Sequence, residues 1–377
     1  MFGNGAAVMT VYWVMVVLAV GFMALGQFIA VKGKHKKNQV LEAASSGEHY
    51  LTFSVVLSAF VYIFVTGFRY GVGRDYFYTY VPYFNNVYYS GKQGRMELGF
   101  YAINYLVSRV TSNPTPVFVI CSIIFFACIY ASILKYSPKP TLSVFLITGM
   151  AFVFVFMNTM RQMVAISILL YGVRFIEDRK PLQFALTVAI ASSFHSSAVV
   201  FLVAYLFTFI KLNAVVAVLT AGALFLSRTL IAQIMLSIVK MSSYSDYIGS
   251  QFDTGNSGNV VMAMNIMVFL FAALVPALEG KKYSSRYNLF LLFQLVAMTM
   301  SFLSGTVVLS QRIKWLFSLP AIILLPMTLH ELRDARIRLI AETTVTVLYV
   351  IYIYITIGMW NGNSVIPYES YFSIGVK

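Results

Sequence analysis

The chain has 377 residues, of which 59% are hydrophobic and 11% are charged, and its mean hydropathy is +0.80. A soluble domain carries roughly 25% charged residues, so this composition predicts an all-α, polytopic membrane protein with many apolar spans. The formal net charge of +14 is not gathered on a soluble domain, so we expect no nucleic acid as a partner. Basic residues in such a chain are better explained as topology signals in cytoplasmic loops.

Apolar segments recur along the whole chain and predict about 12 transmembrane helices in a single domain, 1–377. They cover about residues 8–30, 50–67, 116–134, 141–158, 161–176, 182–195, 197–210, 214–234, 260–278, 289–309, 313–331 and 340–358. The first span has neither a preceding basic residue nor a small-residue cleavage site, so we expect it to be retained as a helix. Cys121 and Cys128 share one span with no His or carboxylate nearby, which predicts small buried hydrophobic residues.

The distribution of lysine and arginine predicts which side of the membrane each loop faces. Four lysines within 32–37 place that loop in the cytoplasm and the N-terminus outside. The segments 182–195 and 197–210 are short, and one fused helix would move the basic clusters at 281–286 and 333–338 outside. We therefore predict a break near His195.

Two long polar segments are then predicted on the outer, extracytoplasmic side. The first, 68–115, is rich in Tyr, Arg and Gly, and long polar loops between short connections are often functional. It overlaps the stretch GFRYGVGRDYFYTY (67–80), and helical spacing predicts an interfacial or re-entrant amphipathic helix at 97–110. The second, 240–259, contains Asp246 and Asp253, and its Ser, Gly and Asn content suits either a flexible lid or a solvated loop.

Arginine is unexpectedly frequent on the predicted outer face, at Arg69, Arg74, Arg95, Arg109, Arg161 and Arg312. The planar guanidinium pairs bidentately with phosphate, so such a group suits a lipid diphosphate. For Arg95 and Arg109, contact with lipid headgroups or a local acid is the better explanation. Arg161 and Arg312 lie between apolar spans with almost no loop, where an arginine is costly unless it faces a polar cavity.

Few side chains on this face can accept a proton. Asp75 follows Arg74 directly and Glu97 lies close to Arg95, so each carboxylate is either a general base or a partner of an arginine. His195 lies among serines at a helix junction, and an imidazole can take a proton from a sugar hydroxyl near neutral pH. A satisfied structural histidine is the alternative. The sequence has no P-loop, GxSxG, HExxH or DxD-type pair, and a diphosphate neutralised by arginines needs no metal.

Six short motifs occur in one order along about 60–376: GFRYGVGRDYFYTY, RMELGFYAINYL, MNTMRQMVAISILLYG, ASSFHSSAVVFL, SQRIKWLF and IPYESYF. With these motifs the chain resembles the EpsG family, which are Wzy-like polymerases of bacterial exopolysaccharide, capsule and O-antigen clusters. The resemblance implies a GT-C-like glycosyltransferase of the bacterial cytoplasmic membrane, working without metal or cofactor. Such enzymes join oligosaccharide repeat units carried on undecaprenyl diphosphate at the outer face of that membrane, and undecaprenyl diphosphate leaves.

The resemblance also implies a set of site residues. The predicted catalytic residues are His195, Glu97, Asp75 and Arg161, and the predicted substrate-binding residues are Arg69, Arg74, Tyr76, Gln162, Arg312 and Tyr368. The histidine and the two carboxylates are alternatives for the general base, the arginines would hold the donor diphosphate, and the tyrosines would contact sugars. Expected partners are the lipid-linked oligosaccharide, membrane lipid, and flippase and chain-length regulator proteins.

Two other functions remain open at this point. A transporter or flippase for lipid-linked oligosaccharide should have cavity charges reachable from both faces, whereas the unusual arginines lie on one predicted face. A membrane sugar O-acyltransferase also uses a histidine, but it needs an acyl donor from the cytoplasm, and His195 is predicted outside.

Overall fold

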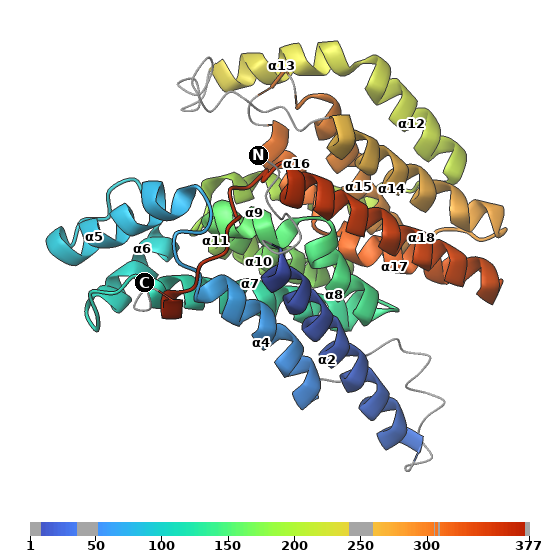
Figure 1. Ribbon diagram of the computed structural model, residues 1–377. Helices are drawn as coiled ribbons and strands as arrows, with labels where there is room; N and C mark the ends of the chain where they lie inside the picture. The colour runs from blue at the N-terminus through green and yellow to red at the C-terminus, as the bar shows by residue number, and fades with distance from the viewer. Residues whose placement is uncertain (1–8, 36–51, 241–258, 305, 308–309, 374–377) are drawn as a thin grey trace. The chain divides into compact units, whose positions relative to one another are not determined.

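Figure 1 shows the computed structural model of the protein, which describes residues 9–35, 52–240, 259–304, 306–307 and 310–373. Within these ranges the regular structure is helical, and its β contribution is one isolated antiparallel bridge between Arg69 and Ser370. The predicted all-α class is therefore confirmed. Residues 241–258, which include most of the predicted second outer loop with Asp246 and Asp253, lie outside the described residues.

Four of the described helices are long and apolar enough to cross a membrane, and three bent pairs would raise the number to seven. The four are α2 (Thr10–His35), α7 (Thr115–Tyr136), α14 (Asn259–Leu278) and α18 (Ala335–Ile353), which continues as a π turn to Met359. These spans support a multi-pass membrane protein, and the count of about 12 stays a prediction.

Three segments expected to be single helices are broken and bent. They are α8 (Pro140–Gly149) with α9 (Phe152–Asn158), bent by 49°; α12 (Ala214–Leu226) with α13 (Arg228–Lys240), by 65°; and α16 (Ser310–Ser318) with α17 (Ala321–Glu331), by 47°. Between α8 and α9, Ala151 has a left-handed φ of 64°, which an α-helix cannot contain. Before α17, Pro320 cannot continue the hydrogen bonding of α16.

The chain forms two compact units, each of which is described by itself. Unit 1 holds the described residues within 1–174, 182–199 and 339–377, and unit 2 holds those within 175–181 and 200–338.

In unit 1, α4 (Phe53–Gly67) packs against α2 and α7, and α2 also packs against α8 (Figure 1). The Ser58 hydroxyl lies 2.6 Å from the carbonyl of Ala19 and 2.7 Å from the Tyr130 hydroxyl, which links α4 to α2 and α7. Gly67 faces the backbone of Val119, and a Cβ there would lie 3.0 Å from the Val119 Cα. Small and hydroxylated residues thus let these helices approach closely, as is usual between membrane helices.

The predicted outer segment 68–115 is more regular than the sequence indicated. It contains a π turn, η1 (Tyr76–Tyr80), followed by α5 (Val81–Ser90) and α6 (Leu98–Ser108). The α6 helix occupies the segment where helical spacing predicted one, and its interfacial position stays a prediction. The α5 helix was not predicted, and it packs against α6.

The helix break predicted near His195 is present. Helix α10 (Met160–Glu177) is followed by α11 (Pro181–Ser192), a turn at 193–195, and the 3₁₀ helix η2 (Ser196–Phe209). In unit 2, α14 packs against α15 (Ser285–Phe302), and α15 packs against α16 and α17.

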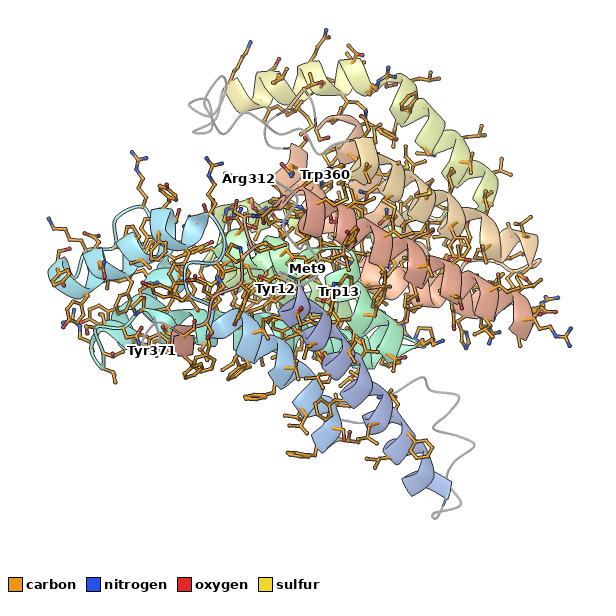
Figure 2. All side chains as sticks on the ribbon, in the orientation of Figure 1. Met9, Tyr12, Trp13, Arg312, Trp360 and Tyr371 are labelled. Atoms are coloured by element: carbon orange, nitrogen blue, oxygen red, sulfur yellow. The ribbon has the colours of Figure 1, made fainter. Side chains whose placement is uncertain are left out.

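The C-terminal segment of unit 1 pairs with residues 68–73. The amide of Tyr371 donates to the Phe68 carbonyl at 2.7 Å, and the Tyr70 amide donates to the Glu369 carbonyl at 2.9 Å. The hydroxyl of Tyr12, on α2, donates to the Val365 carbonyl at 2.6 Å (Figure 2). These bonds hold the segment predicted as an outer tail against the opening stretch of the outer loop.

Candidate functional site

Arg161 and Glu97, two of the predicted catalytic residues, form an ion pair in unit 1. Arg161 lies in the first turn of α10, and its Nη1 donates to Oε2 of Glu97, the residue that directly precedes α6. Their side chains are only 19% and 20% exposed, so the pair is largely shielded from solvent. The guanidinium also lies over the ring of Tyr83, with its Cζ 5.2 Å from the ring centroid.

The start of α10 adds positive potential at the same place. The first N–H groups of a helix have no intrahelical acceptor, and the helix dipole leaves partial positive charge there. Arg161 and Gln162 both belong to this first turn, and Gln162 is buried. A guanidinium at a helix N-terminus is an arrangement suited to an anion such as a diphosphate.

The turn at 193–197 is joined to the same carboxylate. The amide of Ser196 donates to Oε1 of Glu97 at 3.2 Å, and the amide of Gly99 donates to the Ser193 carbonyl at 2.7 Å. Both oxygens of Glu97 are therefore engaged, one by Arg161 and one by the turn. The pairing brings the predicted residues Glu97, Arg161 and the His195 turn together, although they are far apart in the sequence.

The hydrogen bonds of His195 indicate which nitrogen carries its proton. The Ser197 amide donates to His195 Nδ1 at 3.3 Å, and the Ser197 hydroxyl lies 2.8 Å from the same nitrogen. Because a backbone N–H can only donate, Nδ1 accepts, and the neutral imidazole then carries its proton on Nε2. This tautomer presents a donor at Nε2, whereas a general base at Nε2 would require the opposite tautomer.

Tyr80 and Asp75 hold the break between α9 and α10, just before Arg161. The Tyr80 hydroxyl donates to the Asn158 carbonyl at 3.0 Å and accepts from the Met160 amide at 2.6 Å. The Asp75 amide donates to Asn158 Oδ1 at 3.1 Å. Burial raises the pKa of Tyr80 and the Asp75 carboxylate raises it further, so the hydroxyl stays protonated.

Gly73 completes this contact from the same stretch. Its φ of 89° lies in the left-handed region, and a Cβ there would meet the Met157 carbonyl oxygen at 2.6 Å. Residues 73–80 thus fix the position at which α10 begins.

Arg69, a predicted diphosphate ligand, is fully buried with 0% exposure. Its Nη1 donates to the Thr66 carbonyl and its Nη2 to the Met157 carbonyl at 3.2 Å. Thr66 and Met157 lie in the last turns of α4 and α9, so the negative ends of two helix dipoles meet at the guanidinium. Its Cζ lies 4.7 Å from the ring centroid of Phe118. In this arrangement Arg69 supports the structure, and direct ligand contact would require the side chain to become accessible.

The other predicted binding residues of unit 1 occupy varied environments. Tyr76 is 1% exposed and stacks on Phe118 with ring centroids 4.6 Å apart, so its ring packs in the interior. The Tyr368 hydroxyl donates to the Val65 carbonyl at 3.0 Å, which ties the C-terminal segment to α4. Arg74 is exposed, next to Asp75.

Arg312 lies on α16 in unit 2 (Figure 2), so its contribution to the Arg161–Glu97 site stays a prediction. Within the described residues, no three His, Cys, Asp or Glu side chains gather into a possible metal site. Residues that sequence reasoning missed are Tyr83, Tyr80 and Asn158. The last two lie inside motifs quoted above, but nothing in those motifs indicated that a hydroxyl would bridge a helix break.

The helices and the shielded arginine–carboxylate pair define an α-helical membrane protein with a candidate site for an anionic substrate. The chain belongs to the EpsG family: the family model matches residues 52–370, which include Arg161, Glu97 and the 193–197 turn. This confirms the resemblance predicted from the motifs, and it indicates an exopolysaccharide-related, Wzy-like polymerase. Searches of curated proteins and of solved structures gave no match.

Proposed function

We propose that this protein is a polysaccharide polymerase. It joins oligosaccharide repeat units carried on undecaprenyl diphosphate, at the outer face of the bacterial cytoplasmic membrane. Family membership supports the reaction class. The observation that carries the site assignment is the Arg161–Glu97 ion pair at the N-terminus of α10.

In the proposed reaction the ion pair exchanges partners. The donor diphosphate binds Arg161 in place of Glu97, because a diphosphate with two negative charges competes effectively with one carboxylate for a guanidinium. Glu97 is then released from Arg161 while Ser196 still holds its other oxygen. The free carboxylate oxygen is available as general base for the acceptor hydroxyl.

The bonds and charges of this transfer balance without a metal ion. The acceptor oxygen forms a bond to the anomeric carbon of the donor chain while its proton passes to Glu97. The bond from the anomeric carbon to the phosphate oxygen breaks, and the lipid diphosphate leaves with the electron pair. Arg161, the first turn of α10 and the Nε2–H of His195 stabilise the charge that develops on the leaving group. Asp75 is the alternative base, and Arg312 and Arg74 are further candidates to contact the diphosphate.

The test is Arg161→Ala in a cell that makes the polymer, with Arg161→Lys as a charge-conserving companion. Loss of a charge-stabilising donor costs about 10²–10³ in rate, so we expect long polymer to disappear and single lipid-linked repeat units to accumulate. Lysine should restore little, because it lacks the planar fork. Arg95→Ala is the control, since Arg95 is an exposed arginine two residues before Glu97. Undiminished long polymer in Arg161→Ala would refute the central role of Arg161.

The Arg161→Ala strain also distinguishes a polymerase from the two alternative functions, a flippase and an acyltransferase. A flippase defect would leave repeat units on the cytoplasmic side, and an acyltransferase defect would leave polymer length unchanged while removing acyl groups. The predicted orientation is tested by His195→Cys in a background without Cys121 and Cys128, labelled from each side. Labelling from the cytoplasm would contradict an outer site.

A further inference from the structure

A cavity of about 720 Å³ lies within unit 2, and none of the residues assigned above lines it. Three short connections line it: the end of α10 at 176–179, the junction of η2 and α12 at 210–213, and the junction of α14 and α15 at 281–283. Counting the predicted spans from the cytoplasmic loop at 32–37 predicts that all three connections face the cytoplasm. The structure brings these three connections, far apart in sequence, to the wall of one cavity.

Five basic side chains line this cavity, and two of them are neutralised. Arg286 Nε donates to Glu177 Oε1 at 2.7 Å, and Lys281 Nζ lies 2.9 Å from Glu331 Oε2. These two ion pairs join α10 to α15 and the 281–283 connection to α17, so they hold the wall in place. Because both cations are paired with a carboxylate, these ion pairs add no net positive charge to the cavity.

The remaining three basic side chains supply a surplus of positive charge. Arg179, Lys211 and Lys282 line the cavity and are exposed, and none has an ion-pair partner among the residues that the structure describes. A topology signal requires basic residues in cytoplasmic loops, but it does not require three such loops to present them to a common cavity. Their convergence is therefore an observation that topology alone does not explain.

Two helix N-termini add to the same potential. Asn213 caps α12 and Ser284 caps α15, and the first residues of both helices line the cavity. Each N-terminus carries partial positive charge, and a phosphate is favoured there. The lining also includes the apolar side chains Phe207, Ile210 and Leu289. A cavity of this size lined by both basic and apolar side chains suits an amphipathic ligand with an anionic head.

We propose that this cavity binds a phosphate-bearing anion at the cytoplasmic side of the membrane. The apolar lining residues favour an anionic phospholipid, which brings acyl chains with its headgroup, over a soluble phosphate compound. The site is separate from the polymerase assignment, so failure of either proposal leaves the other standing.

The first experiment compares ligands on the purified full-length chain in a neutral detergent. Phosphatidylglycerol, phosphatidylcholine and inorganic pyrophosphate are titrated, with bound lipid counted by native mass spectrometry and the unfolding temperature measured. We expect phosphatidylglycerol to bind and raise the unfolding temperature, while phosphatidylcholine does not. Binding of pyrophosphate but not phosphatidylglycerol would support the site with a soluble ligand. Binding of neither, or equal binding of the two lipids, would overturn the proposal.

The second experiment assigns the binding to the cavity. Each basic residue near an anionic lipid surface contributes about a fivefold affinity, so Lys211→Gln with Lys282→Gln should weaken phosphatidylglycerol binding about 25-fold. The matched control is Arg333→Gln with Arg336→Gln, which removes two exposed charges of unit 2 outside the cavity. An equal loss in control and test variants would show general surface attraction and refute a site.

Arg179→Gly tests the cavity with a substitution that is expected to leave the fold stable. Arg179 has a left-handed φ of 54°, which glycine adopts readily, so Arg179→Gly removes a cavity charge at a position where the backbone favours the substitution. We expect about fivefold weaker phosphatidylglycerol binding with an unfolding temperature, measured without lipid, at or above that of the parent chain. Unchanged binding in this variant would exclude Arg179 and contradict the proposed cavity.

Discussion

Gly99→Ala tests whether the contact between α6 and the 193–197 turn positions the Arg161–Glu97 ion pair. A Cβ at position 99 would lie 2.4 Å from the Ser193 hydroxyl oxygen and 2.9 Å from the Ser193 carbonyl oxygen. The hydroxyl can rotate away, but the carbonyl belongs to the backbone and accepts the Gly99 amide at 2.7 Å. Ordinary contacts begin at 3.4 Å, so α6 or the turn must move by about 0.5 Å.

The size of the effect follows from that displacement. Overpacking of this kind costs about 1–3 kcal/mol of stability. Glu97 lies two residues before Gly99 and bonds both Arg161 and the turn, so the shift is transmitted to the ion pair. A misplacement of about 1 Å can cost about 10²-fold in rate, so we expect polymer yield to fall about 10-fold or more.

The assay for Gly99→Ala measures polymer length and yield in cells together with the unfolding temperature of the purified protein. Gly21→Ala is the control within unit 1, since a Cβ at Gly21 meets nothing within 4 Å. That control should keep full activity and gain about 0.5–1 kcal/mol, because alanine is the better helix former. Full polymer yield from Gly99→Ala would refute the positioning role of this contact.

Three further changes probe other parts of the site. Glu97→Gln keeps the shape but removes the proton acceptor, so polymer formation should fall by about 10²–10⁴-fold with little loss of protein; near-normal polymer would transfer the base role to Asp75. Tyr80→Phe removes two hydrogen bonds across the α9–α10 break, so denaturant unfolding should show a loss of about 1–3 kcal/mol, while Tyr78→Phe, at an exposed position, should show none. Burial raises the pKa of Tyr76 from 10.0 to about 12. The protonated hydroxyl therefore contributes its full share to the free energy of unfolding below pH 10, and this contribution is lost as the pH rises toward 12. In Tyr76→Phe, the fall of the unfolding temperature over this range should be smaller than in the parent chain; an identical fall would contradict the assignment.

A substitution of Arg69 distinguishes a structural role of this side chain from a role in binding the diphosphate. Arg69→Met fills much of the same volume but leaves the Thr66 and Met157 carbonyls without a donor, which should cost about 1–3 kcal/mol. Because the guanidinium is fully buried, we expect any loss of polymer to result from the loss of stability, with a matching fall of the unfolding temperature. A large loss of polymer at an unchanged unfolding temperature would instead support the direct diphosphate contact predicted from the sequence.

Sequence patterns predicted the helical class, the position of most helices and the break near His195, because apolar runs and loop charges are local signals. The bends were not predictable in this way. The bend between α8 and α9 depends on one left-handed residue, Ala151, in a segment whose composition suits an uninterrupted helix. Helix α5 was missed because its aromatic and asparagine residues also suit a loop.

Sequence patterns predicted the residue types of the candidate site but not their pairing. Glu97 and Arg161 are 64 positions apart, and no local pattern indicates that the start of α6 and the start of α10 meet. Arg69 and Tyr76 carry the same functional groups whether buried or exposed, so their burial could not be read from the motif. Whether the predicted outer loop at 240–259 is a lid or a solvated loop is not tested, because residues 241–258 lie outside the described residues.

The pairing of the outer stretch with the C-terminal segment has a consequence for biosynthesis. Gly73 donates its amide to the Ser364 carbonyl at 3.0 Å, and Tyr70 bonds Glu369, so partners of one small structure are separated by about 290 residues. At about 5–20 residues per second, the ribosome supplies the second partner roughly 15–60 s after the first. Residues 67–80 must therefore wait until residues 364–371 have been synthesised before these bonds can close. The stretch that contacts Asn158, just before Arg161, thus gains these partners only after α10 itself has been synthesised.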